Sequence, residues 1–236
     1  MESLGPESGS ADRIAARRPV SNTERRQRVV DEIKCRIILG EILPGQRIIE
    51  AELTSSLDVS RPTAREALNQ MARDGFLIQE AYRGLRVADI HVDSLLEIAR
   101  VRVALDTEAI NEILADTSGR RMADLERVWE RFESAGVDSD PLVLHEAHVR
   151  FHRGIWEAAD NYLLMRIWPV VEAQMTLILA YDQFTRRDAR RAHAIHAALM
   201  VAIRSGDAER IRTALDIHTM DSAQELAFLI GGSSQS

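Results

Sequence analysis

Six of the seven histidines lie in the second half of the chain, and four of them could together bind a metal ion. His148 and His152 are four residues apart, so on a helix they project from the same face. Imidazole pairs at this spacing are good ligands for Zn²⁺ or Ni²⁺. His196 and His218 follow on later helices, which a bundle could bring against the first pair. The alternative, that these are ordinary solvated or core histidines, stays open from the residues alone.

A histidine cluster could also serve a metal-dependent enzyme, such as a hydrolase. The run from His145 through Glu146 to His148 has one residue fewer than the HExxH motif of metalloproteases. No carboxylate in the sequence is convincingly placed as a general base. The histidines therefore indicate a binding site rather than a catalytic one.

A different chemistry is indicated near residue 60. Arg61 and Arg65 project from one face of a helix predicted over residues 61–74, close to its N-terminal end. An arginine there can donate two hydrogen bonds to the O6 and N7 atoms of guanine. Ser60, a good N-cap, and Thr63 could donate to phosphates beside the helix N-terminus. The alternative is a solvated helix face with scattered arginines.

The elements around this helix follow a known order. A helix, an extended segment, a second helix, a tight turn, the third helix and a hairpin are predicted at residues 23–39, 47–49, 50–57, 58–60, 61–74 and 76–87. Gly84 lies at the tip of the hairpin, where Arg83 and Arg86 could reach the backbone or minor groove of DNA. This layout predicts a winged helix-turn-helix, with the helix over residues 61–74 in the major groove. The inward stripe of that helix is expected to be Ala64, Ala67, Leu68 and Met71.

From residue 92 onward the strand signals vanish. Helices are predicted at residues 92–116, 120–135, 141–159, 162–185, 187–205 and 207–230. Pro169 should kink the fourth of them. Short connections predict antiparallel neighbours. The expected fold class is mainly α, with an N-terminal winged helix-turn-helix and a C-terminal all-α antiparallel helical bundle.

The distribution of charge agrees with two parts. Of 236 residues, 30 are basic and 37 acidic, a net charge of −7. Residues 11–90 hold 14 of the basic and 12 of the acidic ones, so this part is slightly positive and the rest strongly negative. The predicted organisation is a flexible arm at residues 1–20, the winged domain at 21–90, the helical domain at 91–230 and a disordered tail at 231–236.

The sequence also bounds the location. A single cysteine, Cys35, excludes an intramolecular disulfide and fits a reducing cytosol. The first twenty residues lack the apolar stretch of a signal peptide. No apolar run approaches the roughly 20 residues that span a bilayer, and the longest candidate is residues 175–180. We expect a cytoplasmic protein without a membrane partner.

The N-terminal part closely resembles the GntR family of bacterial regulators over about residues 23–88. The landmarks are Gly40-x-x-x-Pro44-Gly45, Leu53-x-x-x-Leu57-x-Val59-Ser60-Arg61-x-x-x-Arg65-Glu66-Ala67-Leu68, Asp74-Gly75 and Gly84. The resemblance implies DNA contact by Ser60, Arg61, Thr63 and Arg65, and by the wing at Gly84. Many members carry a further operator-binding arginine where this chain has Ala51. Either that contact is lost or a neighbour such as Arg47 replaces it.

Residues 92–230 resemble the FCD effector domain of one GntR subfamily. The landmarks are Arg102-x-x-Leu105-Asp106, Phe151-His152, Asn161, His196, Gly206-Asp207 and His218. In metal-binding members the ligands are an aspartate and three histidines, which map onto His148, His152, His196 and His218. Four neutral donors would leave the site more positive and favour Zn²⁺ or Ni²⁺. Two alternatives to this four-histidine site stay open: His148 marks a site that has drifted away from metal, or His145 or Glu146 substitutes for the aspartate.

The resemblance implies a small carboxylate effector, such as a sugar acid, hydroxy acid or dicarboxylate. Arg102 would bind that carboxylate through two hydrogen bonds, unless it only forms a salt bridge with Asp106. Asn161 is expected to cap a helix. The chain is predicted to be a homodimeric regulator, more often a repressor in this family, on a pseudo-palindromic operator. The alternative is a DNA-binding dimer whose helical domain only dimerises and binds no ligand.

Overall fold

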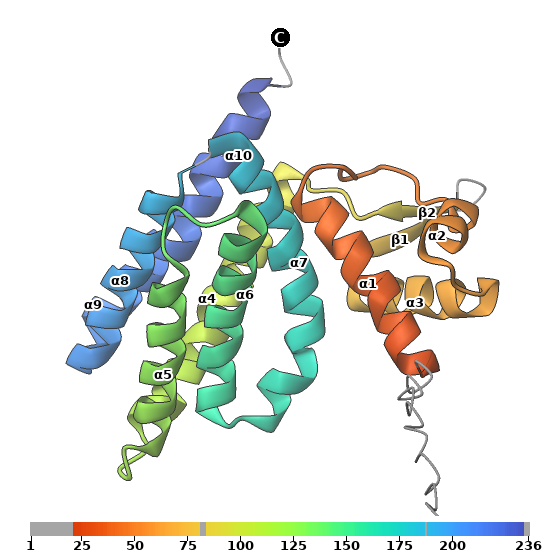
Figure 1. Ribbon diagram of the computed structural model, residues 1–236. Helices are drawn as coiled ribbons and strands as arrows, with labels where there is room; N and C mark the ends of the chain where they lie inside the picture. Colours follow the sequence, from red (N-terminus) through yellow and green to blue (C-terminus); the bar gives the residue numbers. More distant parts are fainter. Residues whose placement is uncertain (1–20, 81–83, 187, 234–236) are drawn as a thin grey trace, which may run out of the picture.

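The computed structural model describes residues 21–80, 84–186 and 188–233. They form two lobes that lie side by side, a small one with a hairpin and a larger helical one (Figure 1). The predicted arm at residues 1–20 lies outside the described residues. The elements of the small lobe are α1 Asn22–Ile38, α2 Glu50–Leu57, α3 Arg61–Asp74, β1 Leu77–Glu80 and β2 Gly84–Val87.

The helices of the small lobe begin and end at local signals. At the start of α1, Ser21 accepts from the backbone N–H of Glu24, whose carboxylate accepts in return from the N–H of Ser21. Ser60 caps α3, and Gly75 ends it at a φ of +90°, which glycine adopts without strain. The predicted inward stripe of α3 is confirmed, since all four side chains are at most 1% exposed: Ala64, Ala67, Leu68 and Met71.

The hairpin is antiparallel and short. Leu77 lies opposite Val87, and Glu80 lies opposite Gly84. The extended segment before α2 joins this hairpin through a single bridge between Arg47 and Arg86. This hairpin, the wing, is therefore bonded through β2 to the loop that follows α1, and its residues Leu77 and Val87 belong to the core of the small lobe.

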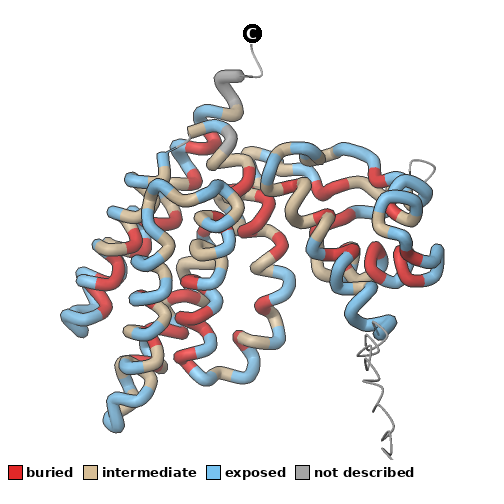
Figure 2. The backbone as a smooth tube through the Cα atoms, in the orientation of Figure 1, coloured by how far each residue is buried: buried red, intermediate tan, exposed pale blue. Residues whose placement is uncertain are grey.

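The larger lobe is helical throughout its described residues. Its core contains the buried Trp129, Trp156 and Trp168. Figure 2 shows buried positions along the inner faces of the helices in both lobes. The elements are α4 Val92–Leu114, α5 Arg120–Ala135, α6 Pro141–Ala159, α7 Tyr162–Arg186, α8 Ala189–Ser205, α9 Ala208–Leu215, the π-helix η1 Asp216–Asp221 and α10 Ser222–Ser233.

The end of the chain differs from the prediction. One α-helix was expected over residues 207–230, but six residues of it, Asp216–Asp221, form a π-helix. The disordered tail was expected from residue 231, whereas α10 continues to Ser233. A π-turn inserts one extra residue into a helix and is rare, so the 3.6-residue pattern gave no sign of it.

The long helix α7 needs a correction too. Its segment Tyr162–Gln183 has a mean hydropathy of 1.4 and would be long and apolar enough to cross a membrane, contrary to the sequence expectation. The helix continues through Pro169, and Figure 1 shows it bent near its beginning. It packs against α1, α4 and α6, which is the setting of a core helix.

The two lobes share an apolar interface. Helix α1 packs against α6 and α7, and α3 packs against α7. Ala173, Leu177 and Ala180 of α7 belong to the core of the small lobe. Lys34 on α1 forms an ion pair with Glu172 on α7 at 2.7 Å, and Glu172 also accepts from Trp168 Nε1 at 2.7 Å. A displacement of α6 or α7 in the larger lobe would therefore be transmitted to the small lobe through α1.

Candidate DNA interface and histidine cluster

The N-terminal end of α3 is open to solvent and carries the two predicted arginines. Arg61 is exposed, and the side chain of Arg65 is 68% exposed. Arg65 donates to Glu50 of α2, with the closest nitrogen and oxygen 3.2 Å apart. This ion pair holds the guanidinium across the surface between α2 and α3. Both arginines are thus available on the face that a major groove would meet.

The two hydroxyls at this end have different settings. Ser60 is exposed and accepts from the backbone N–H of Thr63 at 3.3 Å. Thr63 is buried, and its hydroxyl donates to Asn22 Oδ1 on α1 at 3.0 Å. The predicted phosphate contact of Thr63 is therefore replaced in this structure by a contact inside the protein, which joins the starts of α1 and α3.

The wing was predicted to offer Arg83, Gly84 and Arg86. Arg83 lies outside the described residues. Gly84 has a φ of +81°, and a Cβ placed there would lie 3.6 Å from Nε of Arg47. Arg86 is half-buried and donates to the carbonyl of Gly45 at 2.8 Å, so it holds the wing in place. Arg47, considered as a replacement for the arginine absent at Ala51, is exposed and lies beside Gly84 of the wing.

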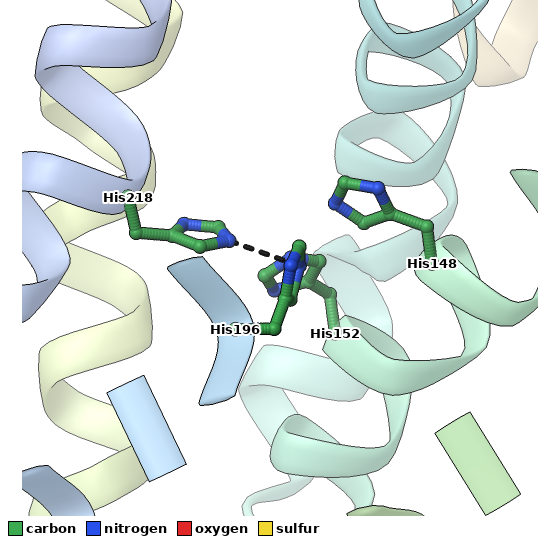
Figure 3. A group of neighbouring side chains, drawn as sticks. All are labelled: His148, His152, His196 and His218. Atoms are coloured by element: carbon green, nitrogen blue, oxygen red, sulfur yellow. Dashed lines mark hydrogen bonds between the residues drawn. The ribbon is translucent and has the colours of Figure 1, made fainter. Parts of the chain in front are cut away.

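The four predicted metal ligands come together inside the larger lobe (Figure 3). His148 and His152 project from α6, His196 from α8 and His218 from η1. One nitrogen from each lies within 4.8 Å of all the others. Nε2 of His196 is 3.1 Å from Nε2 of His152 and 3.0 Å from Nε2 of His218. The π-helix is the element that presents His218 to this cluster.

Neighbouring groups orient the rings of His196 and His218. Nδ1 of His196 lies 2.5 Å from the carbonyl of Ala192, which requires a proton on Nδ1 and leaves a lone pair on Nε2. Nδ1 of His218 lies 2.9 Å from the hydroxyl of Thr219. Outer contacts of this kind fix the tautomer of a metal-binding histidine. His148, the residue that departs from the family pattern, has no hydrogen bond within the described part of the chain.

The surroundings of the cluster keep its four imidazoles uncharged. Burial lowers the pKa of His148, His152 and His218 well below the usual range, and the positive charges around them lower it further. Burial also lowers the pKa of His196 to about 4. Deprotonated imidazoles are the form that binds a metal ion. The donor set and its protonation therefore fit Zn²⁺ or Ni²⁺.

The two suggested substitutes for the missing aspartate do not join the cluster. Glu146 is exposed and pairs with Arg150 at 2.7 Å. His145 is 4% exposed, and neither of its ring nitrogens has a hydrogen-bond partner. Burial lowers its pKa to about 4. Neither residue is among the group of converging ligand atoms.

Arg102 does two things that the sequence analysis treated as alternatives. Its Nε lies 3.3 Å from Asp106 Oδ2, while its Nη2 lies 2.9 Å from Nδ1 of His152. Asp106 is 1% exposed and accepts from Trp156 Nε1 at 2.7 Å, and burial raises the pKa of its carboxyl. Sequence reasoning noted Asp106 as a family landmark and a salt-bridge partner, and nothing in its spacing showed the contact with Trp156. Asn161 caps α7 as predicted, accepting from the N–H groups of Leu163 and Leu164.

Comparisons with known proteins agree with this two-part fold. The family model "Bacterial regulatory proteins, gntR family" matches residues 25–87, and the model "FCD domain" matches residues 97–221. The uncharacterised HTH-type transcriptional regulator BphR of Paraburkholderia xenovorans is 26% identical over 79% of this chain and 78% of its own. The probable D-xylose utilisation operon transcriptional repressor of Paenarthrobacter nicotinovorans is 26% identical over 86% and 89%. The solved structure of Escherichia coli McbR/YncC shares the fold, with a TM-score of 0.68, 21% identity and coverage of 89% and 98%.

A winged helix-turn-helix joined to an all-helical domain defines a class of DNA-binding transcriptional regulators, and the protein is a regulator rather than an enzyme. The chain belongs to the GntR family of bacterial regulators and carries the FCD domain of one of its subfamilies.

Proposed function

We propose that this protein is a cytoplasmic homodimeric repressor whose operator binding is controlled by a small carboxylate bound beside a zinc or nickel ion. The observation that supports the proposal most strongly is the convergence of four neutral imidazoles next to Arg102. Ser60, Arg61, Arg65 and the wing with Arg83 and Gly84 contact the operator, and Thr63 positions the start of α3. Two copies of α3 in a two-fold dimer require a pseudo-palindromic site.

The contact between Arg102 and His152 supports a link between metal and effector. A neutral imidazole has one proton and one lone pair. When His152 gives its lone pair to a metal, neither ring nitrogen can accept from Arg102. The guanidinium then keeps its partner Asp106 and has donors free for a carboxylate, which it can bind bidentately. A bound metal supplies Lewis acidity that holds and orients the same anion.

Control of the operator follows from differential binding. An effector that binds one arrangement of the two lobes better shifts the population of DNA-competent dimers by its difference in affinity. The packing of α1 on α6 and α7 provides the mechanical connection. Repression relieved by the effector is the behaviour we propose, in keeping with the repressor names of several relatives.

The metal content of the purified, untagged protein tests the site. We expect near-stoichiometric zinc or nickel in the wild type and in His91→Ala, a change at an exposed histidine outside the cluster. His152→Ala should lose the ion. A protein that contains no metal and takes up none from zinc or nickel solutions overturns the metal part of the proposal.

Operator release tests the effector. A pseudo-palindromic site is selected from random DNA with the metal-loaded protein, and release is then measured with gluconate, lactate and succinate. We expect at least one carboxylate to weaken operator binding and raise the melting temperature in the wild type, with both effects reduced in Arg102→Gln. If no carboxylate alters either quantity, the helical domain serves dimerisation alone and the proposal fails.

A further inference from the structure

A large cavity lies where the two lobes meet. Its volume is about 510 Å³, within the roughly 300–1,000 Å³ typical of ligand sites. Ile38 and Leu39 line it from the end of α1, in the small lobe. Phe132 of α5, Leu144 of α6 and Leu179 of α7 line it from the larger lobe. The cavity therefore has walls from both the DNA-binding and the histidine-bearing parts.

This junction cavity is adjacent to the histidine cluster. A second cavity of about 90 Å³ is lined by Arg102, His196 and His218. The two cavities share His148, Leu179, Asp182 and Ala192 as walls. The smaller cavity has room for little more than a carboxylate group. The shared walls make the junction cavity available to the larger part of a ligand held there.

The walls of the junction cavity suit an apolar, ring-bearing group. Phe132 stacks on His193 with ring centroids 5.8 Å apart and an interplanar angle of 13°. The described walls include no lysine or arginine that could pair with a second anionic group; Asp182 is paired with Arg186 at 2.6 Å, and Asp188 caps α8. His145 lines the same cavity, is 4% exposed and has no hydrogen-bond partner for either ring nitrogen.

We propose that the effector is a monocarboxylic acid with an apolar, ring-bearing body, bound across both cavities. Its carboxylate lies at Arg102 and the cluster, and its body fills the junction cavity against Ile38 and Leu39. One molecule then contacts the DNA-binding part directly, in addition to acting through the helical bundle. This inference rests on the proposed function, because it assigns the carboxylate to the same site.

Binding of three probe acids to the zinc-loaded, full-length protein tests the inference. Acetate fits the small cavity alone, whereas phenylacetate and 4-phenylbutyrate extend into the large one. By calorimetry we expect 4-phenylbutyrate to bind at least about tenfold more tightly than acetate, because of the apolar area it buries. Equal affinity for acetate and 4-phenylbutyrate overturns the inference.

Two matched pairs of variants localise the body of the ligand. Ala135→Trp fills the junction cavity from the end of α5 and should remove the tenfold gain, whereas Ala208→Trp, at an exposed site outside it, should not. Ile38→Ala should weaken 4-phenylbutyrate several-fold and leave acetate unchanged, while Leu43→Ala, on an exposed loop, should leave both unchanged. An unaltered preference in both Ala135→Trp and Ile38→Ala places the body elsewhere and overturns the inference.

Failure here can be told apart from failure of the proposed function. If the protein binds zinc and acetate but binds 4-phenylbutyrate no more tightly than acetate, the proposed site stands. Only the inference that one ligand spans both cavities then fails. A protein that binds no zinc but still prefers 4-phenylbutyrate, with the gain removed by Ala135→Trp, retains the junction cavity as a ligand site and loses the metal.

Discussion

The recognition helix and the histidine cluster present their functional residues in opposite ways. Arg61 and Arg65 lie on one exposed helix, within four residues of each other, and local caps at Ser60 and Gly75 suffice to place them. The cluster draws on three separate elements and is enclosed by the bundle. We therefore expect changes around α3 to alter DNA affinity with little effect on stability. Changes around the cluster should alter stability as well as ligand binding.

The largest effect is expected at Asp106, beneath the cluster. Asp106→Ala would leave Trp156 Nε1 and Arg102 without their buried partner, at a cost of about 3–5 kcal/mol in the free energy of unfolding. Asp106→Asn keeps an acceptor for Trp156 and should cost less. The measurement is urea denaturation, with Asp138→Ala, whose side chain is 89% exposed, as the control. Equal stabilities of Asp106→Ala and the wild type would contradict the account.

Acidification should also destabilise the region around the histidine cluster more than the region around α3. His145 has a pKa of about 4 when folded, against about 6.5 unfolded. The unfolded chain thus binds the extra proton between these values, and stability is lost as pH falls through this range. From pH 7 to pH 5, His145 alone accounts for about 2 kcal/mol.

Urea denaturation of the metal-free protein at the two pH values measures this effect. His145→Gln, which has no titrating group, should lose about 2 kcal/mol less than the wild type over the same interval. Identical losses of stability in the two proteins would show that folding does not lower the pKa of His145.

Gly154 of α6 lies where this helix is in close contact with α5. A Cβ at this position would overlap the methyl groups of Val128, closer than any real contact. Gly154→Ala should destabilise the protein by about 1–3 kcal/mol through overpacking. Val128→Ala removes the obstructing methyl groups, so the double variant should recover part of the loss. A double variant no more stable than Gly154→Ala would rule out this contact as the cause.

On the exposed side, Arg65→Ala should weaken operator binding by about 1–3 kcal/mol and leave the melting temperature nearly unchanged. Arg73→Ala, at the far end of the same helix, is the control and should change neither quantity much. Fluorescence anisotropy with a selected operator gives the affinity. A large fall in melting temperature for Arg65→Ala would contradict the expectation that changes around α3 have little effect on stability.

These differences explain what could be predicted from the sequence. The bounds of α3, α5 and α6 were predicted correctly, because N-caps, glycine ends and proline starts are local. Those of α2, which has no side-chain cap, followed from the extended segment before it and the turn at Asp58. The convergence of His148, His152, His196 and His218 agreed with helical spacing and family resemblance. The internal use of Thr63 and the Asp106–Trp156 contact escaped because each joins residues about 40 or 50 apart in sequence. The junction cavity exists only once two domains have packed together.

The π-helix at Asp216–Asp221 has a further consequence for the last stretch of the chain. Each residue turns a regular α-helix by about 100°, so an inserted residue would rotate everything after it by that amount unless a wider turn takes it up, as this π-helix does. His218 within this segment, and Leu215 and Leu226 on either side of it, are all buried. Removal of a single residue from this segment would restore a regular helix and change the direction of the side chains within it, including that of His218. A one-residue deletion here is therefore expected to be tolerated far less well than a substitution, and proteins that share the cluster should keep this length fixed.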